Sequence, residues 1–201
     1  MTGPDRGMAG LDRAVTELDR GMTGPEPIGG LTLRPWRDDD AAALVAAAGD
    51  PLLERWTKVR VAGPGQAQQW LQVQHAGRRQ GDRYSFAVLD ETGTLVGNVA
   101  LKRPDPDAEA AEVGYWTAAY ARGRGIAPQA LESLTRWVWA AFPGLLSLRL
   151  LHQLDNTGSC RVALKCGYAY AQTLSAQEPY PQVGHLHVRG RRPSPGVSDA
   201  G

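Results

Sequence analysis

The sequence has little cysteine, no long apolar run and almost no net charge. Its only two cysteines in 201 residues, Cys160 and Cys166, lie within one predicted helix, at a spacing that fits neither a common zinc site nor a disulfide framework. We expect two small buried thiols and no bound metal. No apolar run approaches the length that spans a bilayer, and residues 1–25 lack a signal-peptide core. We therefore expect a cytoplasmic protein with no membrane partner.

The sequence also lacks an excess of charge of either sign, because it contains 22 Lys and Arg residues and 21 Asp and Glu residues. This balance gives no reason to expect nucleic acid as a partner. The length suits one domain with a proper core. We predict a flexible Gly- and Pro-rich tail over residues 1–29, with a short helix over residues 11–20, one domain over residues 30–189, and a disordered tail over residues 190–201.

Between the two tails the apolar residues follow a mixed pattern of period 2 and period 3.6. The pattern predicts strands over residues 31–36, 85–89, 95–101, 111–117, 146–151, 168–174 and 183–188. It predicts helices from Asp38–Asp40 to about residue 48, and over residues 65–80, 125–142 and 157–166. Their order indicates an α+β fold with some parallel pairing around the long helix.

A loop rich in Gly and Arg joins the predicted strand over residues 111–117 to the long helix. The first amides of a helix have no partner within it and lie at its positive end, so an anion binds favourably there. Gly123 and Gly125 allow the backbone to approach a pyrophosphate closely, and Arg122 and Arg124 add charge. The loop therefore predicts a phosphate site; a tight connection with solvent-facing arginines is the alternative.

Two motifs carry a family resemblance. Arg122, Gly125 and Ala127 match the acyl-CoA signature of GNAT proteins, which is Gln or Arg, two residues, Gly, one residue, then Gly or Ala. Downstream, Asn156-Thr157-Gly158-Ser159-Cys160-Arg161-Val162 and Lys165-Cys166-Gly167-Tyr168 resemble the second hallmark of RimJ/RimL-type acetyltransferases. The resemblance covers roughly residues 30–189.

The resemblance implies the GNAT fold, a mixed central sheet of six to seven strands flanked by about four helices and splayed between the fourth and fifth strands. It implies acetyl-CoA as the co-substrate, and many relatives are homodimers, so we expect a homodimer. The residues expected to bind the co-substrate are Tyr115, Trp116, Thr117, Arg122, Gly123, Arg124, Gly125, Ile126, Ala127 and Asn156. Asn156 is equally expected as the cap of the following helix.

The same resemblance suggests catalytic residues for direct attack of an amine on the thioester. Ser159 is expected to protonate the departing thiolate, or else to bond to backbone in the first helical turn. Glu112 is the candidate base and His152 its rival, although a solvent-facing or structural role suits either residue. Trp56 and Tyr84 could line the acceptor pocket or simply pack.

Three functions follow from these expectations. The first is an acetyltransferase that acts on a protein N-terminus or a small amine. The second is a transferase for a bulkier acyl group such as succinyl, which would need a wide or basic pocket beside the thioester. The third is a protein that binds acyl-CoA without turnover, because the fold alone does not decide function.

Overall fold

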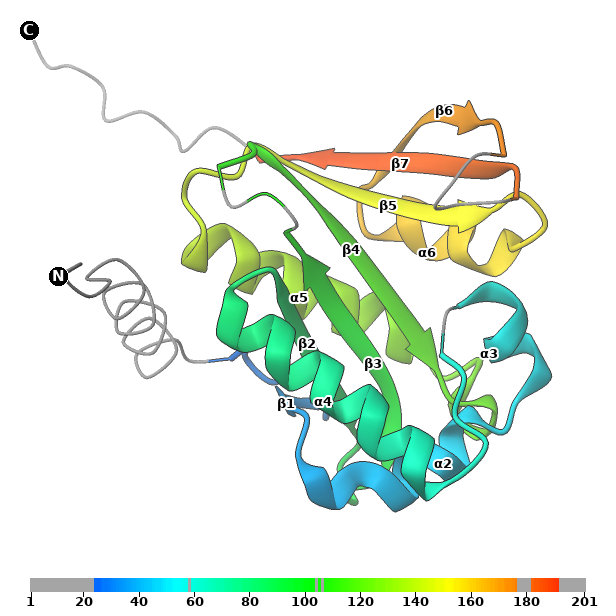
Figure 1. The fold of residues 1–201 in the computed structure, drawn as a ribbon. Helices are drawn as coiled ribbons and strands as arrows, with labels where there is room; N and C mark the ends of the chain where they lie inside the picture. Colours follow the sequence, from blue (N-terminus) through cyan, green and yellow to red (C-terminus); the bar gives the residue numbers. More distant parts are fainter. Residues whose placement is uncertain (1–23, 58, 104, 106, 177–181, 192–201) are drawn as a thin grey trace, which may run out of the picture.

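The computed structural model describes residues 24–57, 59–103, 105, 107–176 and 182–191. Within these residues one mixed sheet contains seven strands in the order β1-β2-β3-β4-β5-β7-β6 (Figure 1). The predicted helix over residues 11–20 lies outside the described residues. The strands are β1 (Thr32–Pro35), β2 (Arg83–Leu89), β3 (Leu95–Lys102), β4 (Ala110–Thr117), β5 (Ser147–Gln153), β6 (Ala169–Leu174) and β7 (Gly184–Gly190).

Five α-helices occur in the described part of the chain: α2 (Ala41–Ala48), α3 (Pro51–Trp56), α4 (Pro64–Gln80), α5 (Ile126–Ala141) and α6 (Thr157–Lys165). Two 3-10 turns, η1 (Asp38–Asp40) and η2 (Ala119–Ala121), precede α2 and α5. The helix that the sequence did not predict is α3. The Asp50 side chain accepts a hydrogen bond from the amide of Leu52 at 3.1 Å, and Pro51 occupies the first turn. These cap signals were present, but six residues are too few to show a helical period.

The sheet is buried on both faces in its N-terminal part. Phe86 and Val88 of β2 pack into a core with α5, whereas Ala87 between them packs into a second core with α2 and α4. This alternation explains why β2 and β3 read as nearly continuous apolar runs rather than as alternating ones. None of the described helices is long and apolar enough to cross a membrane.

Strands β4 and β5 separate along their length. They pair in parallel only over four residues each, from Ala110 opposite Ser147 to Val113 opposite Leu150. Beyond these residues β4 continues to Thr117 alongside β3, and β5 continues to Gln153 alongside β7. The two strands diverge there (Figure 1). The splay that was predicted between the fourth and fifth strands is confirmed.

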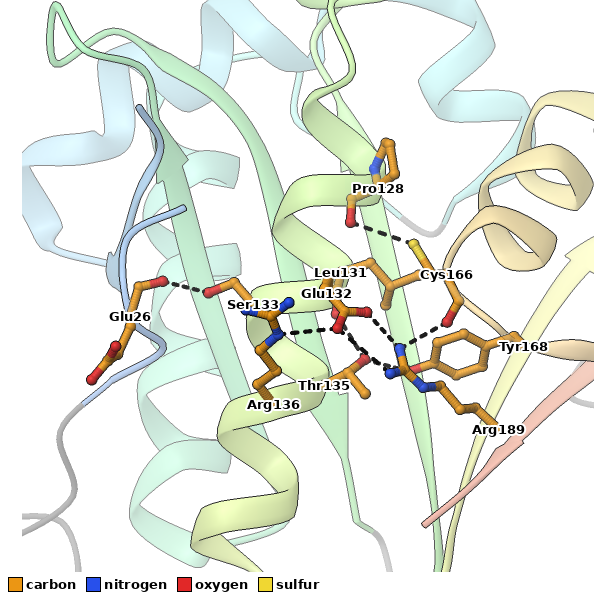
Figure 2. A network of polar contacts seen from close by, with 10 residues as sticks. All are labelled: Glu26, Pro128, Leu131, Glu132, Ser133, Thr135, Arg136, Cys166, Tyr168 and Arg189. Carbon is orange, nitrogen blue, oxygen red and sulfur yellow. Dashed lines mark hydrogen bonds and ion pairs between the residues drawn. The ribbon is translucent and has the colours of Figure 1, made fainter. Parts of the chain in front are cut away.

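A polar network on α5 fastens the C-terminal part of the fold behind this splay (Figure 2). Arg189 of β7 donates to the Glu132 carboxylate at 2.5 Å and to the Cys166 carbonyl at 2.8 Å. The hydroxyl groups of Thr135 and Tyr168 lie 2.7 Å apart, in hydrogen-bond contact. Helix α5 therefore holds both the end of α6 and strand β7.

Burial and neighbouring charge shift the pKa of Glu132 in opposite directions. Burial favours a raised pKa, but the hydrogen bond and charge of Arg189, with a smaller contribution from Arg136, outweigh it and lower the pKa of this carboxyl group. On the opposite side of α5, Ser133 donates to the Glu26 carbonyl at 2.6 Å (Figure 2). The segment before β1 is thus attached to the same helix.

Candidate active site

A cleft of about 1250 Å³ opens at the splay. Its walls come from both parts of the sheet, from the end of α3, from the loop before α5 and from the start of α6. Among the described residues that line it, Glu112 is the one carboxylate, against seven Lys and Arg residues: Arg55, Arg60, Arg83, Lys102, Arg122, Arg161 and Lys165. Arg55, Lys102 and Arg122 pair with carboxylates, and the other four cations leave the lining basic, which suits a ligand that carries several negative charges.

The start of α5 forms one end of this cleft. Gly123 and Gly125 have φ values of 77° and 76°, in the left-handed region that residues with a Cβ rarely adopt. Gly125 is the N-cap and offers no side-chain cap, and the first turn contains no acidic residue. Ile126 and Ala127 line the cleft, so their amides and the positive helix end remain available to an anion.

The two arginines of the loop take different directions. Arg122 lines the cleft and forms an ion pair with Asp50. Burial works against ionisation of Asp50, but the hydrogen bond and charge of Arg122, together with hydrogen bonds from the backbone of Leu52 and Leu53, outweigh it and lower the pKa of that carboxyl group. Arg124 lies 3.4 Å from Asp90, and it is absent from the described lining of the cleft. The structure thus supports a ligand contact for Arg122 and places Arg124 elsewhere.

The splayed strand edges form the middle of the cleft. Tyr115, Trp116 and Thr117, which we expect to bind the co-substrate, all line it, and so do residues 151–153 of β5. Neither stretch pairs with the other. Backbone groups that would have joined a β-ladder therefore face the cleft and can bond to amides of an extended ligand.

A hydroxyl pair lies at the start of α6. The Tyr115 hydroxyl donates to Ser159 Oγ at 3.0 Å, and the Asn156 side chain accepts a bond from the Ser159 amide at 3.1 Å. The capping role of Asn156 is thus observed, and Asn156 also lines the cleft. Burial raises the pKa of Tyr115 to about 12, so the phenol keeps its proton. Because Ser159 accepts that proton's hydrogen bond, its own O–H is free to donate into the cleft.

Glu112 projects from the opposite face of the sheet. Side chains alternate along a strand, and Val113 and Tyr115 pack in the core on the α5 side. Glu112 and Trp116 therefore point toward the α4 side, where Trp116 packs. Glu112 forms an ion pair with Lys102 of the neighbouring strand, and both residues line the cleft. The cleft thus connects the two faces, with Ser159 at one side and Glu112 at the other.

His152 and Trp56 also line the cleft. Burial, with smaller contributions from His187 and His185, lowers the pKa of His152, although a bond to the Gln153 carbonyl opposes the shift. Its imidazole is therefore neutral near pH 7. The indole N–H of Trp56 is buried and has no hydrogen-bond partner among the described residues. A polar ligand group in the cleft could accept this bond.

The structure corrects the placement of Tyr84. Its ring packs against Phe142 and Trp137, at centroid distances of 5.2 and 5.6 Å, in the core on the α5 side. The alternation along β2 directs Tyr84 to that face, and it is Ser85 that lines the cleft. Sequence reasoning missed Ser85 and its partner Asn98, whose side-chain oxygen accepts the Ser85 hydroxyl at 2.7 Å. The period-2 pattern of the hairpin could have found both.

Comparison with known proteins agrees with this architecture. A family model described as acetyltransferase (GNAT) domain matches residues 30–169. The chain therefore belongs to the GNAT acetyltransferase family. A ribosomal-protein-serine acetyltransferase from Escherichia coli (strain K12) is 32% identical over 93 residues, which are 46% of this chain and 51% of that protein. The chain thus spans about half the length of this curated relative.

Solved structures share the fold. RimJ from Mycobacterium smegmatis, in complex with a CoA disulfide, is 22% identical with a TM-score of 0.69, covering 80% of this chain and 81% of that one. The ribosomal-protein α-N-acetyltransferase RimL, in complex with coenzyme A, is 16% identical with a TM-score of 0.72, covering 83% and 97%. The resemblance to RimJ/RimL-type proteins is confirmed.

Proposed function

We propose that this chain transfers an acetyl group from acetyl-CoA to a primary amine by direct attack, without a covalent enzyme intermediate. One observation carries the proposal: the splay between β4 and β5 opens directly onto the uncapped N-terminus of α5. The pyrophosphate of CoA would bind at Gly123, Gly125 and the first amides of α5, with Arg122 beside it. The pantetheine arm would replace the missing ladder partner between the splayed strands.

The two faces of the cleft would supply different catalytic groups, Glu112 on one and Ser159 on the other. The amine would approach from the face of Glu112, whose carboxylate takes its proton directly or through water. The amine nitrogen then bonds to the thioester carbon, and the carbon–sulfur bond breaks as the tetrahedral intermediate collapses. Ser159 would donate its proton to the departing thiolate, and the second proton that the attacking nitrogen loses would return to Ser159 through water. The Tyr115 hydroxyl holds Ser159 in place by its hydrogen bond. Proximity supplies much of the rate, since the thioester is already activated.

The acceptor is proposed to be a protein N-terminus. This choice is supported by the curated relative, whose printed name refers to a ribosomal-protein serine, and by RimL, which is described as an α-N-protein acetyltransferase. A small-molecule amine remains the alternative acceptor. We also propose a cytoplasmic homodimer, which light scattering on the purified protein would test.

A second function is favoured by the charge of the cleft. Arg60 and Arg83 line the cleft, and residues of this kind could neutralise a carboxylate on a bulkier acyl group such as succinyl. The two proposals differ in the donor. Steady-state rates with acetyl-CoA and succinyl-CoA, measured on one acceptor panel, would rank them.

The proposed function is tested by combining thiol release with CoA-induced thermal stabilisation. Purified protein is mixed with each acyl-CoA and a panel of peptides with free N-termini and small amines. Stabilisation with acceptor-dependent thiol release would support a transferase. Stabilisation without release from any donor and acceptor would favour acyl-CoA binding without turnover, and the absence of stabilisation would overturn the phosphate site.

A charge variant locates the binding site within this experiment. Ala127→Glu places a carboxylate in the first turn of α5, where it is compatible with the helix dipole but repels pyrophosphate. We expect the unliganded protein to keep its melting temperature and the CoA-induced shift to disappear. Ala140→Glu, at an exposed site near the other end of α5, is the matched control and should keep the shift.

A further inference from the structure

Four side chains with metal-binding atoms converge beside the cleft. His152 lies on β5, His185 and His187 lie on β7, and Cys160 lies on α6. The ligand atoms that these residues can offer all lie within 4.8 Å of one another. The chain contains four histidines, and His75 is the one outside this group. We refer to the four residues as the His-Cys cluster.

Strand pairing produces this convergence. His152 lies opposite His185, and Leu150, two residues before His152, lies opposite His187. Because side chains alternate along each strand, the three imidazoles share one face of the sheet. Their rings are close, with His152 and His187 stacked at a centroid distance of 5.2 Å. Cys160 reaches the same place from the adjacent helix α6.

Hydrogen bonds to the backbone define the protonation of two of these rings. Nδ1 of His187 lies 3.2 Å from the Tyr168 carbonyl, and Nδ1 of His152 lies 2.8 Å from the Gln153 carbonyl. A carbonyl oxygen only accepts, so Nδ1 carries the proton in each ring and the Nε2 lone pair is free. Metal-bound histidines are usually oriented by the same arrangement, in which the second nitrogen donates to a carbonyl or carboxylate.

One nitrogen of each of the three rings is buried without a hydrogen-bond partner among the described residues. Nε2 of His152, Nε2 of His187 and Nδ1 of His185 are all buried and have no hydrogen-bond partner among the described residues. His187 is 0% exposed. An unsatisfied buried polar atom costs about 1–3 kcal/mol. Ring stacking does not satisfy these three nitrogens, whereas one shared cation would bind all of them, with His185 in the tautomer whose Nδ1 carries no proton.

We propose that the His-Cys cluster binds one divalent transition-metal ion, with zinc the preferred ion. Imidazole nitrogen and thiolate sulfur are the ligand types that zinc binds in tetrahedral sites, and four such donors would complete a tetrahedron here. Such a site separates its ligand atoms by roughly 3.3–3.8 Å, so the longest separation of 4.8 Å would need to shorten by about 1–1.5 Å. Cys160 binds as the thiolate, and its proton is released to solvent on binding.

A metal at this place would act on the geometry of the cleft. Cys160 directly follows Ser159, so a bond from Cys160 to the metal would tie the start of α6 to β5 and β7. This bond would limit the movement of the Ser159 hydroxyl. His152 would use its lone pair for the metal, which gives it a positioning role and leaves Glu112 as the base.

The test uses the full-length protein, freed of metal by a chelator and then titrated with Zn²⁺ and with Co²⁺. Cobalt reports the site directly, because a tetrahedral thiolate complex produces intense d–d absorption and a sulfur-to-cobalt charge-transfer band. We expect one equivalent to bind, zinc to displace cobalt, and the melting temperature to rise with the metal. The absence of stoichiometric binding, or spectra without a thiolate band, would overturn the proposal.

Matched variants assign the ligands. Cys160→Ser should abolish the charge-transfer band and raise the cobalt dissociation constant by at least about tenfold, whereas Cys166→Ser should keep both. If Cys160→Ser does not fold, His185→Gln serves in its place, with His75→Gln as the control. An equal cobalt dissociation constant in the ligand variant and in its control variant would refute the assignment. None of these measurements depends on acyl transfer.

Discussion

The two parts of the sheet on either side of the splay are built differently. Strands β2 and β3 are buried at nearly every position and lie between two helical layers. Strand β6, at the other edge, is exposed at five of its six positions. The N-terminal part therefore gains its stability from two apolar cores, whereas the C-terminal part shares one core and depends more on polar contacts.

The two walls of the cleft come from these two parts of the sheet. The N-terminal part presents Glu112 and leads into the Gly- and Arg-rich loop before α5, so these groups are attached to the part of the sheet that packs into two apolar cores. The C-terminal part presents Ser159 and the His-Cys cluster, and it is joined to the rest by a short parallel pairing and by the contacts of Glu132 and Arg189. The comparison predicts different effects for substitutions on the two sides and at their junction.

The largest effect is expected for Glu112→Gln on the N-terminal wall. Loss of the base should lower kcat/KM by about 10³-fold, while thermal stabilisation by CoA is retained. Glu109→Gln, an exposed residue just before the same strand, should leave the rate unchanged. A full rate in Glu112→Gln would show that the base lies elsewhere.

On the C-terminal wall, Ser159→Ala should lower kcat by about 10²-fold without weakening CoA binding. The loss should be smaller with a thioester whose thiol is more acidic, because such a leaving group needs less help from a proton donor. Thr157→Ala, exposed in the same turn of α6, is the control. Equal losses with both thioesters would exclude the role of proton donor.

At the junction of the two parts, Glu132→Gln should lower the free energy of unfolding by about 1–2 kcal/mol near pH 7, measured by urea denaturation. The lowered pKa of Glu132 means that its stabilisation is complete above the unfolded pKa of about 4.3 and is lost as the pH falls through the folded value. The difference between wild type and variant should therefore shrink below about pH 4. Glu54→Gln, which removes an exposed carboxylate on α3, is the matched control.

The smallest effect is expected on CoA binding, from substitutions in the Gly- and Arg-rich loop before α5. Arg122→Gln should raise the dissociation constant of CoA by about threefold to tenfold, and the effect should weaken with added salt. Arg124→Gln should change it by less than about twofold, because Arg124 faces Asp90 rather than the cleft. Calorimetric titrations at two salt concentrations would test the pair, and equal losses would contradict the two directions seen here.

Much of the site could be predicted because its residues are close in sequence. The loop from Arg122 to Ala127 and the turn from Asn156 to Ser159 are short segments whose local conformation follows from glycine and from helix capping. Roles that depend on the direction of a side chain were harder to predict from the sequence. Tyr84 was expected to line the acceptor pocket or to pack, and strand alternation places it in the core. Arg124 was expected at the phosphate site or facing solvent, and it pairs with Asp90. Whether the remaining candidates act in catalysis stays a prediction.

By itself the sequence determined the fold family and the order of the elements apart from α3 and the 3-10 turns, and it located the Gly- and Arg-rich loop before α5, since these follow from apolar periodicity and from contiguous motifs. Only the tertiary structure decided which groups meet across the chain. The Tyr115–Ser159 hydrogen bond joins residues 44 positions apart, and the His-Cys cluster depends on the register of β5 against β7. A shift of one residue in that register would move the paired side chains to opposite faces, and no local pattern in the sequence specifies it.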